Sequence, residues 1–128
     1  MAAMSNYLET KFLDHFTGRA STSAPSNVYV SLWTSDPTDA GSGNEVSGTG
    51  YARQAITWDA ASGGTIDNAA VVDFPAAGAS WGTCTHFGIH DAATSGNLLF
   101  HGALSASKAI ATNDIFRIAA GGITITAA

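Results

Sequence analysis

The sequence has 128 residues, of which Ala, Gly, Ser and Thr account for 65, and the large apolar residues Ile, Leu, Val and Phe for only 25. Charged residues make up 12% of the chain and the net charge is −5, too little charge to suggest a disordered chain. The five Lys and Arg residues form no cluster, no apolar run approaches the ~20 residues of a membrane span, and a single Cys excludes a disulfide framework. We therefore expect one folded domain over residues 1–128, with no cofactor and with neither nucleic acid nor membrane as a partner.

The N-terminal segment has the pattern of an α-helix over about residues 6–17. The apolar side chains that recur every four residues and would form a stripe are Leu8, Phe12 and Phe16. Asn6, with Ser5 as an alternative, can cap the start of the helix, and Gly18 can end it. A helix of this length is marginal alone, so the stripe is expected to pack either on its own domain or on a neighbouring subunit.

From about residue 27 the apolar residues alternate instead, which is the pattern of β-strands. The segment VYVSLWT, residues 28–34, is the clearest case. Further strand candidates, separated by turn residues, are 51–59, 65–68, 71–74, 83–90, 97–104, 115–119 and 123–126. No alternation of strands with helices is visible. The sequence therefore predicts a mainly β fold: an antiparallel β-sandwich, jelly-roll-like, over about residues 27–127, with one N-terminal α-helix.

Residues 35–50 form a long Gly-rich segment between two strand candidates, and loops of this length are often functional surfaces. Its possible oxygen ligands for calcium are Asp36, Asp39, Asn44 and Glu45. Their spacing is not that of an EF-hand, and such residues in Gly/Ser loops more often form turns, so no metal site is predicted. Arg53, which follows the loop, is a candidate structural cation that would pair with Glu45 or Asp59.

The sequence gives little support to an enzyme. No serine lies in a G-x-S-x-G motif, and no phosphate-binding glycine loop is present. His86 and His90 share one face of a predicted strand but would lie ~13 Å apart, too far to bind one metal ion. The aromatic residues that could form a sugar-stacking platform are Tyr29, Trp33, Tyr51, Trp58 and Trp81. Packing is the more common role of such residues, so no catalytic residue is predicted.

Several stretches resemble a family of small tailed-bacteriophage virion proteins, often labelled tail fibre or structural protein. The similarity extends from Asn6 to Thr126. It is carried mainly by a D-P-x-D-x-G-x-G-x-E-V loop at 36–46, G-Y-A-R at 50–53, and W-G-x-x-x-x-F-G-I-x-D-A at 81–92. The resemblance implies a non-enzymatic component of the virion, assembled in the cytoplasm of the bacterial host.

Within that family, the short chain without repeats or heptads favours a capsid decoration or cement protein that stabilises the head lattice. The alternatives are a tail or tail-fibre component, acting as an adaptor or in receptor binding, and a carbohydrate-binding module. We expect a homo-oligomer, a dimer or trimer, that contacts the major capsid protein or other virion proteins. The residues expected at its interfaces are Leu8, Phe12, Phe16, Asp36, Asp39, Glu45, Tyr51, Arg53 and Trp81.

Overall fold

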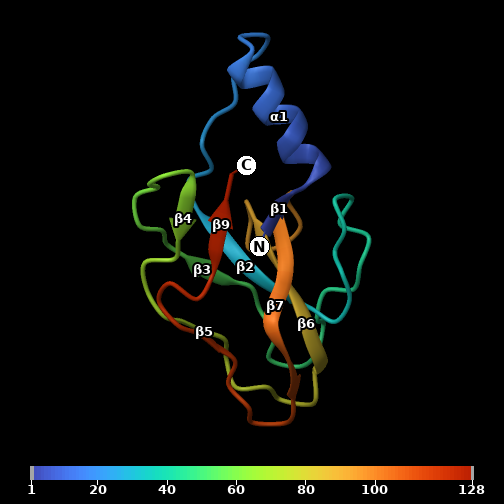
Figure 1. Cartoon of the computed structure of the whole chain (residues 1–128). Coiled ribbons are helices and arrows are strands. Elements are labelled where there is room, and N and C mark those ends of the chain that lie inside the picture. The colour runs from blue at the N-terminus through green and yellow to red at the C-terminus, as the bar shows by residue number, and fades with distance from the viewer. Residues whose placement is uncertain (1, 128) are drawn as a thin grey trace.

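The computed structural model describes residues 2–127, and the prediction of a mainly β, antiparallel fold with one N-terminal helix is confirmed (Figure 1). The elements in chain order are β1 (Ala2–Met4), α1 (Asn6–Phe16), β2 (Val28–Trp33), β3 (Gln54–Ile56), β4 (Thr65–Asp67), β5 (Val72–Asp73), β6 (Gly82–His90), β7 (Leu98–Ile110), β8 (Arg117–Ile118) and β9 (Thr124–Thr126). No helix in this part of the chain is long and apolar enough to cross a membrane.

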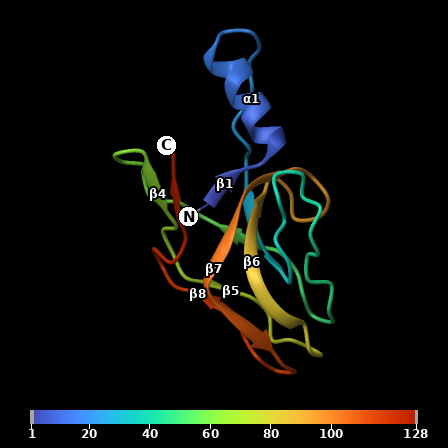
Figure 2. The same ribbon diagram turned by 45° about the vertical axis from the view of Figure 1, so that its right-hand side comes forward.

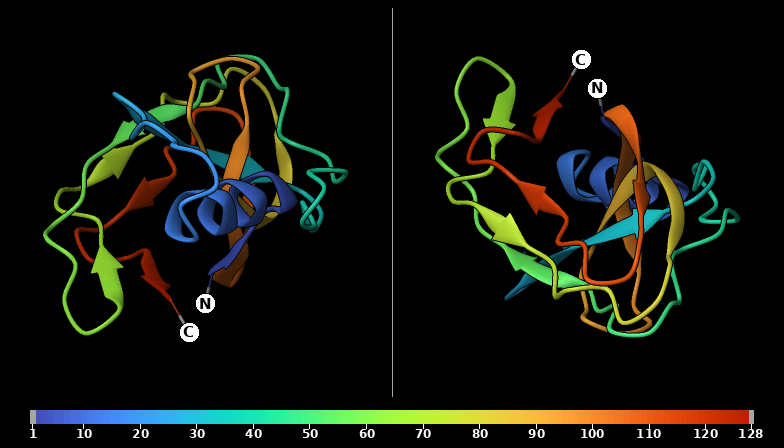
Figure 3. Two further views of the ribbon diagram at one scale, coloured as in Figure 1. Left: turned by 90° about the horizontal axis from the view of Figure 1, so that it is seen from above. Right: turned by 90° about the horizontal axis from the view of Figure 1, so that it is seen from below.

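The strands form one large sheet and two short ladders. The large sheet has the order β1-β7-β6-β2-β3, and all its neighbouring strands are antiparallel. The ladders β4–β9 and β5–β8 face this sheet across the core, as the end-on views show (Figure 3). The most deeply buried apolar side chains between the two layers are Val30, Leu32, Phe74, Cys84, Ile89 and Ile110.

Strand β2 is buried on both of its faces. Val30 and Leu32 face the core, whereas Ser31 and Trp33 face the other way and are buried as well. The outer face is closed because Gly88 on the neighbouring strand leaves room: a Cβ at this position would lie 2.9 Å from Trp33 Nε1. The scarce large side chains are thus buried on both sides of β2.

Helix α1 is joined firmly at its base and projects from the β-layers at its other end (Figures 1 and 2). Ser5, rather than Asn6, is the N-cap, and its side chain accepts a hydrogen bond from Leu8 N at 3.2 Å. Ser5 N also donates to Leu99 O at 2.9 Å, which ties the cap to β7. Gly18 follows the helix with φ +77°, as expected of a residue that ends a helix.

Two strand predictions differ most from the structure in their lengths. The segment 51–59 forms the short β3 and an isolated bridge from Trp58 to Asn68, and Tyr51 and Arg53, which precede β3, contribute their side chains to a polar network described below. Strand β7 continues six residues beyond the predicted 97–104, through small and polar residues that carry no alternating apolar signal. The pairing of β1 with β7 was not predicted, because Ala2–Met4 is too short to show a period.

Candidate functional site

The far end of α1 carries the largest group of exposed apolar side chains in the described chain. Phe12, Leu13 and Phe16, here called the helix tip, are 45%, 60% and 71% exposed, and the helix has no buried residue. The rings of Phe12 and Phe16 pack on each other, with centroids 4.9 Å apart. Leu8 lies closer to the β-layers and is half-buried. Of the predicted stripe, therefore, the outer two phenylalanines remain open to a neighbour.

The base of α1 rests on the Gly-rich loop. Asn6 N donates a hydrogen bond to Asp39 O at 2.9 Å, and the carboxylate of Asp39 lies 2.8 Å from His101 Nε2 on β7. Asp36 lies farther from the same imidazole, at 3.8 Å from Nδ1. The structure thus brings the two predicted loop aspartates together at one histidine, where they fix the loop to the sheet and to the helix.

A second predicted group, Glu45, Tyr51 and Arg53, forms one internal network. The Glu45 carboxylate accepts hydrogen bonds from Tyr51 Oη at 2.7 Å and from Arg53 Nε and Nη2 at 2.9 and 2.8 Å. Arg53 Nη1 donates to the carbonyls of Ala92 and Ser95 at 3.0 and 2.7 Å. The prediction that Arg53 is a structural cation is confirmed, with Glu45 as its partner. The network joins the loop of residues 35–50 to the turn that follows β6.

The protonation states of this network are fixed. Burial by itself raises the pKa of Glu45, but the hydrogen bonds from Arg53 and Tyr51 outweigh it and the pKa lies below its ordinary value. Burial and the adjacent carboxylate raise the pKa of Tyr51. The hydrogen bond to Glu45 raises the pKa of Arg53. At neutral pH, therefore, Glu45 and Arg53 stay charged and Tyr51 stays neutral. Fixed protonation states of this kind suit a structural contact and not proton transfer.

Trp33 and Trp81 pack inside the protein, as predicted, and Trp58 is half-buried against the core. Trp81 is 5% exposed, donates from Nε1 to Thr49 O at 3.0 Å, and contacts Tyr51 edge-on at 5.5 Å between ring centroids. Trp33 is equally buried and lies parallel to the His90 ring. Their ring faces are therefore not available as an exposed platform for sugars.

One histidine, His90, contacts a serine inside the protein. His90 Nε2 lies 2.9 Å from Ser31 Oγ, but both residues are buried, and within residues 2–127 His90 Nδ1 has no hydrogen-bond partner that could orient the ring. Burial lowers the pKa of His90 to about 4, with the charge of Arg53 acting in the same direction. The same residues contain no group of three or more His, Cys, Asp or Glu side chains that could hold a metal ion.

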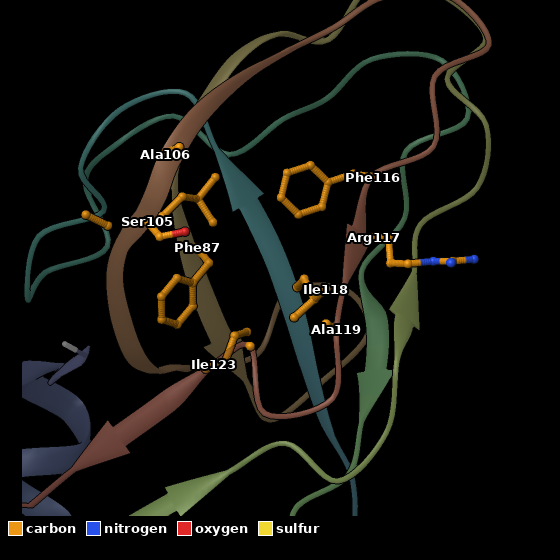
Figure 4. Close-up of a pocket in the computed structure, with 11 residues that line it drawn as sticks. Phe87, Ser105, Ala106, Phe116, Arg117, Ile118, Ala119 and Ile123 are labelled. Carbon is orange, nitrogen blue, oxygen red and sulfur yellow. The ribbon is translucent and has the colours of Figure 1, made fainter.

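One surface feature was not predicted: a cleft of about 200 Å³ between β7 and β8 (Figure 4). One wall is the β7 segment 103–106, and the other is the segment 116–119 around β8. Phe87 lies between the walls and Phe116 points into the opening, whereas Arg117 points away from it, toward Asp73. Because the cleft depends on how the two wall segments face each other in the folded chain, no local sequence pattern could have indicated it.

The chain thus folds as a small β-domain from which a helix with exposed apolar side chains projects. Over residues 3–126 the sequence matches the family described as Podophage GP4 fiber I protein gp80, so the chain belongs to this family of phage fibre proteins. None of the curated proteins compared with the chain matches it. The predicted resemblance to phage virion structural proteins is confirmed, and the family description agrees with the tail-fibre alternative.

Proposed function

We propose that the chain is a non-enzymatic structural subunit of a phage tail fibre, and that copies of it associate through their helix tips. The observation that carries the proposal is the exposure of Phe12, Leu13 and Phe16 on a helix that projects from the β-layers. Such an arrangement leaves the apolar side chains in water unless another surface covers them, and exposed apolar groups of this kind mark interaction sites.

Identical helix tips are suitable partners for one another. Every copy presents the same apolar side chains, so a symmetric contact pairs apolar with apolar surface without any change of sequence. Fully burying a large apolar side chain contributes about 1.5–3 kcal/mol, and the tip residues are already about half covered, so three of them contribute roughly 3–5 kcal/mol per copy. This amount is modest, and further contacts along the fibre would add to it.

The family description supports a fibre over the capsid location that the chain length alone favoured. Capsid decoration is the second candidate, because residues 2–127 form a β-rich fold without repeats, and such a fold also suits a module bound to a head lattice. The number of copies in each particle separates the two. Quantitative mass spectrometry of purified virions should give on the order of ten copies for a fibre subunit with cyclic symmetry, against hundreds for a lattice protein. Immunogold labelling at the head surface would contradict the fibre assignment.

The role of the helix tip is tested with charged substitutions. The double variant Leu13→Glu/Phe16→Glu should remain folded, because neither side chain is buried, but should sediment as a monomer where the natural chain sediments as an oligomer. The matched control is Val71→Glu/Ile115→Glu, two side chains on the β-domain that are 51% and 55% exposed. The control should leave the oligomer intact. An oligomer that survives the tip variant, or a natural chain that is monomeric both alone and in particles, would refute the proposed contact.

A further inference from the structure

At one end of the large sheet the short strand β1 covers only part of the outer edge of the long strand β7. Strand β1 pairs with the first part, from Met4 opposite Phe100 to Ala2 opposite Gly102. Beyond that point, residues 103–109 pair with no strand on the outer side anywhere in the described chain, and all but Leu104 are exposed. Alternate residues of a strand direct both backbone polar groups to the same side, so this stretch presents free N–H and C=O groups.

The opposite wall of the cleft is also a strand edge. Strand β8 pairs with β5 on one side, with Ile118 opposite Val72. On its other side it faces β7 across the cleft, as Figure 4 shows, and it forms no ladder there within residues 2–127. Higher in the molecule, the corresponding place beside β7 is filled by β1, which also contacts β9 (Figure 2). The cleft is therefore the part of this gap that β1 does not fill.

The side chains along β7 indicate the same opening. Leu104 packs against the core, Ile110 is buried, and Lys108 lies opposite the fully buried Cys84, so these three residues face inward. Ala106 lines the cleft, yet both Ala106 and Lys108 are exposed. The inner face of the sheet is thus uncovered where the second layer is missing. Lys108 forms no ion pair with any residue between 2 and 127.

We propose that the cleft accepts an extended strand from another virion protein. The strand would pair with the free edge of β7, place alternate apolar side chains over Phe87 and Phe116, and carry an acidic residue opposite Lys108. Edge addition of this kind draws its affinity from backbone hydrogen bonds and its specificity from pockets for alternate side chains. The inference rests on the proposed function, because that function supplies the neighbouring virion protein.

A second copy of the chain is a poorer occupant of this site. The edge carries Lys108, and it bends at a bulge where residues 104–107 lie opposite the single residue Thr85. A lysine and a bulge on an edge are features that oppose pairing between identical edges. A different protein with an acidic strand meets the same lysine with a favourable charge. The charge of the edge therefore favours a partner of another sequence.

Hydrogen–deuterium exchange on the intact particle tests the proposal directly. The amides of residues 103–109 should exchange at least about tenfold more slowly in purified virions than in the isolated chain. Equal exchange in the two samples would overturn the proposal. Protection that already develops in the isolated chain as its concentration rises would assign the site to a second copy, and would also overturn it. If the chain is present in the fibre but the amides of residues 103–109 exchange no more slowly there, only this inference is contradicted. If the chain is absent from the fibre, the proposed function is contradicted.

Two pairs of variants locate the contact. Ala106→Trp fills the cleft from its wall, whereas Ala55→Trp adds the same ring to an exposed residue of β3, at the other end of the sheet and outside the cleft. In particles assembled from equal amounts of natural and variant chain, Ala106→Trp should be depleted about tenfold and Ala55→Trp should not. Lys108→Glu should be depleted as well, and Lys11→Glu, which reverses the charge of the other lysine in the chain, should not. If a test variant is incorporated as well as its control in either pair, the assignment is overturned.

Discussion

Replacing Arg53 with Ala tests whether the network around Glu45 holds the long loop on the β-domain. The substitution removes two hydrogen bonds to the Glu45 carboxylate and two to the carbonyls of Ala92 and Ser95. The side chains of Arg53 and Glu45 are only 10% and 23% exposed, so water replaces the lost partners poorly. Tyr51 Oη would remain as the one described hydrogen-bond donor to the carboxylate.

The expected loss of stability follows from that geometry. Removing one member of a buried ion pair costs about 3–5 kcal/mol, and the partial access of water to Glu45 places this case near the lower limit, at about 3 kcal/mol. The loss should also depend on pH. The pKa of Glu45 is lowered in the folded protein, so the ionised carboxylate contributes stability above its ordinary value of 4.5, and this contribution is lost as pH falls through the lower folded value. The variant should therefore be less sensitive to pH in that range.

Urea unfolding followed by tryptophan fluorescence measures this change, since Trp33 and Trp81 are both buried. The matched control is Arg117→Ala, which removes the exposed ion pair with Asp73, where the two side chains are 66% and 45% exposed. Exposed pairs contribute little, so the control should change stability far less than Arg53→Ala. The reasoning is refuted if the two variants lose the same stability, or if Arg53→Ala leaves the exchange of loop amides unchanged.

Two further predictions concern buried polar groups. Asn68→Ala should lower the free energy of unfolding in urea by about 3 kcal/mol, because the buried amide donates to the carbonyls of Ala70 and Ala119 and accepts from the N–H of Ile123. A loss no larger than that of an exposed substitution would contradict this prediction. His90 should remain neutral in NMR titration at about pH 5.5, since burial lowers its pKa to about 4. In the unfolded chain the imidazole takes up a proton near pH 6.5, whereas in the folded protein it does so only near pH 4, so the free energy of unfolding should decrease as pH falls from 6.5 toward 4. A His90 ring that titrates near pH 6.5 in the folded protein would refute this prediction.

The sequence was most informative where the pattern was local and periodic. The helix was predicted at 6–17 and lies at 6–16, and the first strand was predicted at 28–34 and lies at 28–33. Both contain regularly spaced large apolar side chains, which specify the period directly. Of the two cap residues considered for the helix, Ser5 is the cap and Asn6 is not; the backbone of Ser5 is also held by β7, a contact that the sequence does not show.

The candidate site was only partly predictable, because its parts meet through tertiary contacts. The pairing of Arg53 with Glu45 could be anticipated from two opposite charges close together in the sequence. The contact of Asp39 with His101 could not, since it joins residues 62 positions apart. The β7–β8 cleft could not be anticipated, because the strand patterns at 97–104 and 115–119 do not show that these two segments face each other without pairing. Whether the predicted interface residues contact other subunits remains a prediction for the experiments above.

The way in which α1 is mounted has a mechanical consequence. The chain runs from β1 through the helix and back along residues 17–27 into β2, so the helix is held by two strands of the same sheet. A force applied to the helix tip is divided between β1, which is bonded to β7, and β2, which lies between β6 and β3. Because hydrogen bonds lie across the strands, a pull along the strand direction must break several of them together rather than one after another. If a neighbouring molecule binds the helix tip, tension on the helix is thus carried by the strand hydrogen bonds of β1 and β2 together.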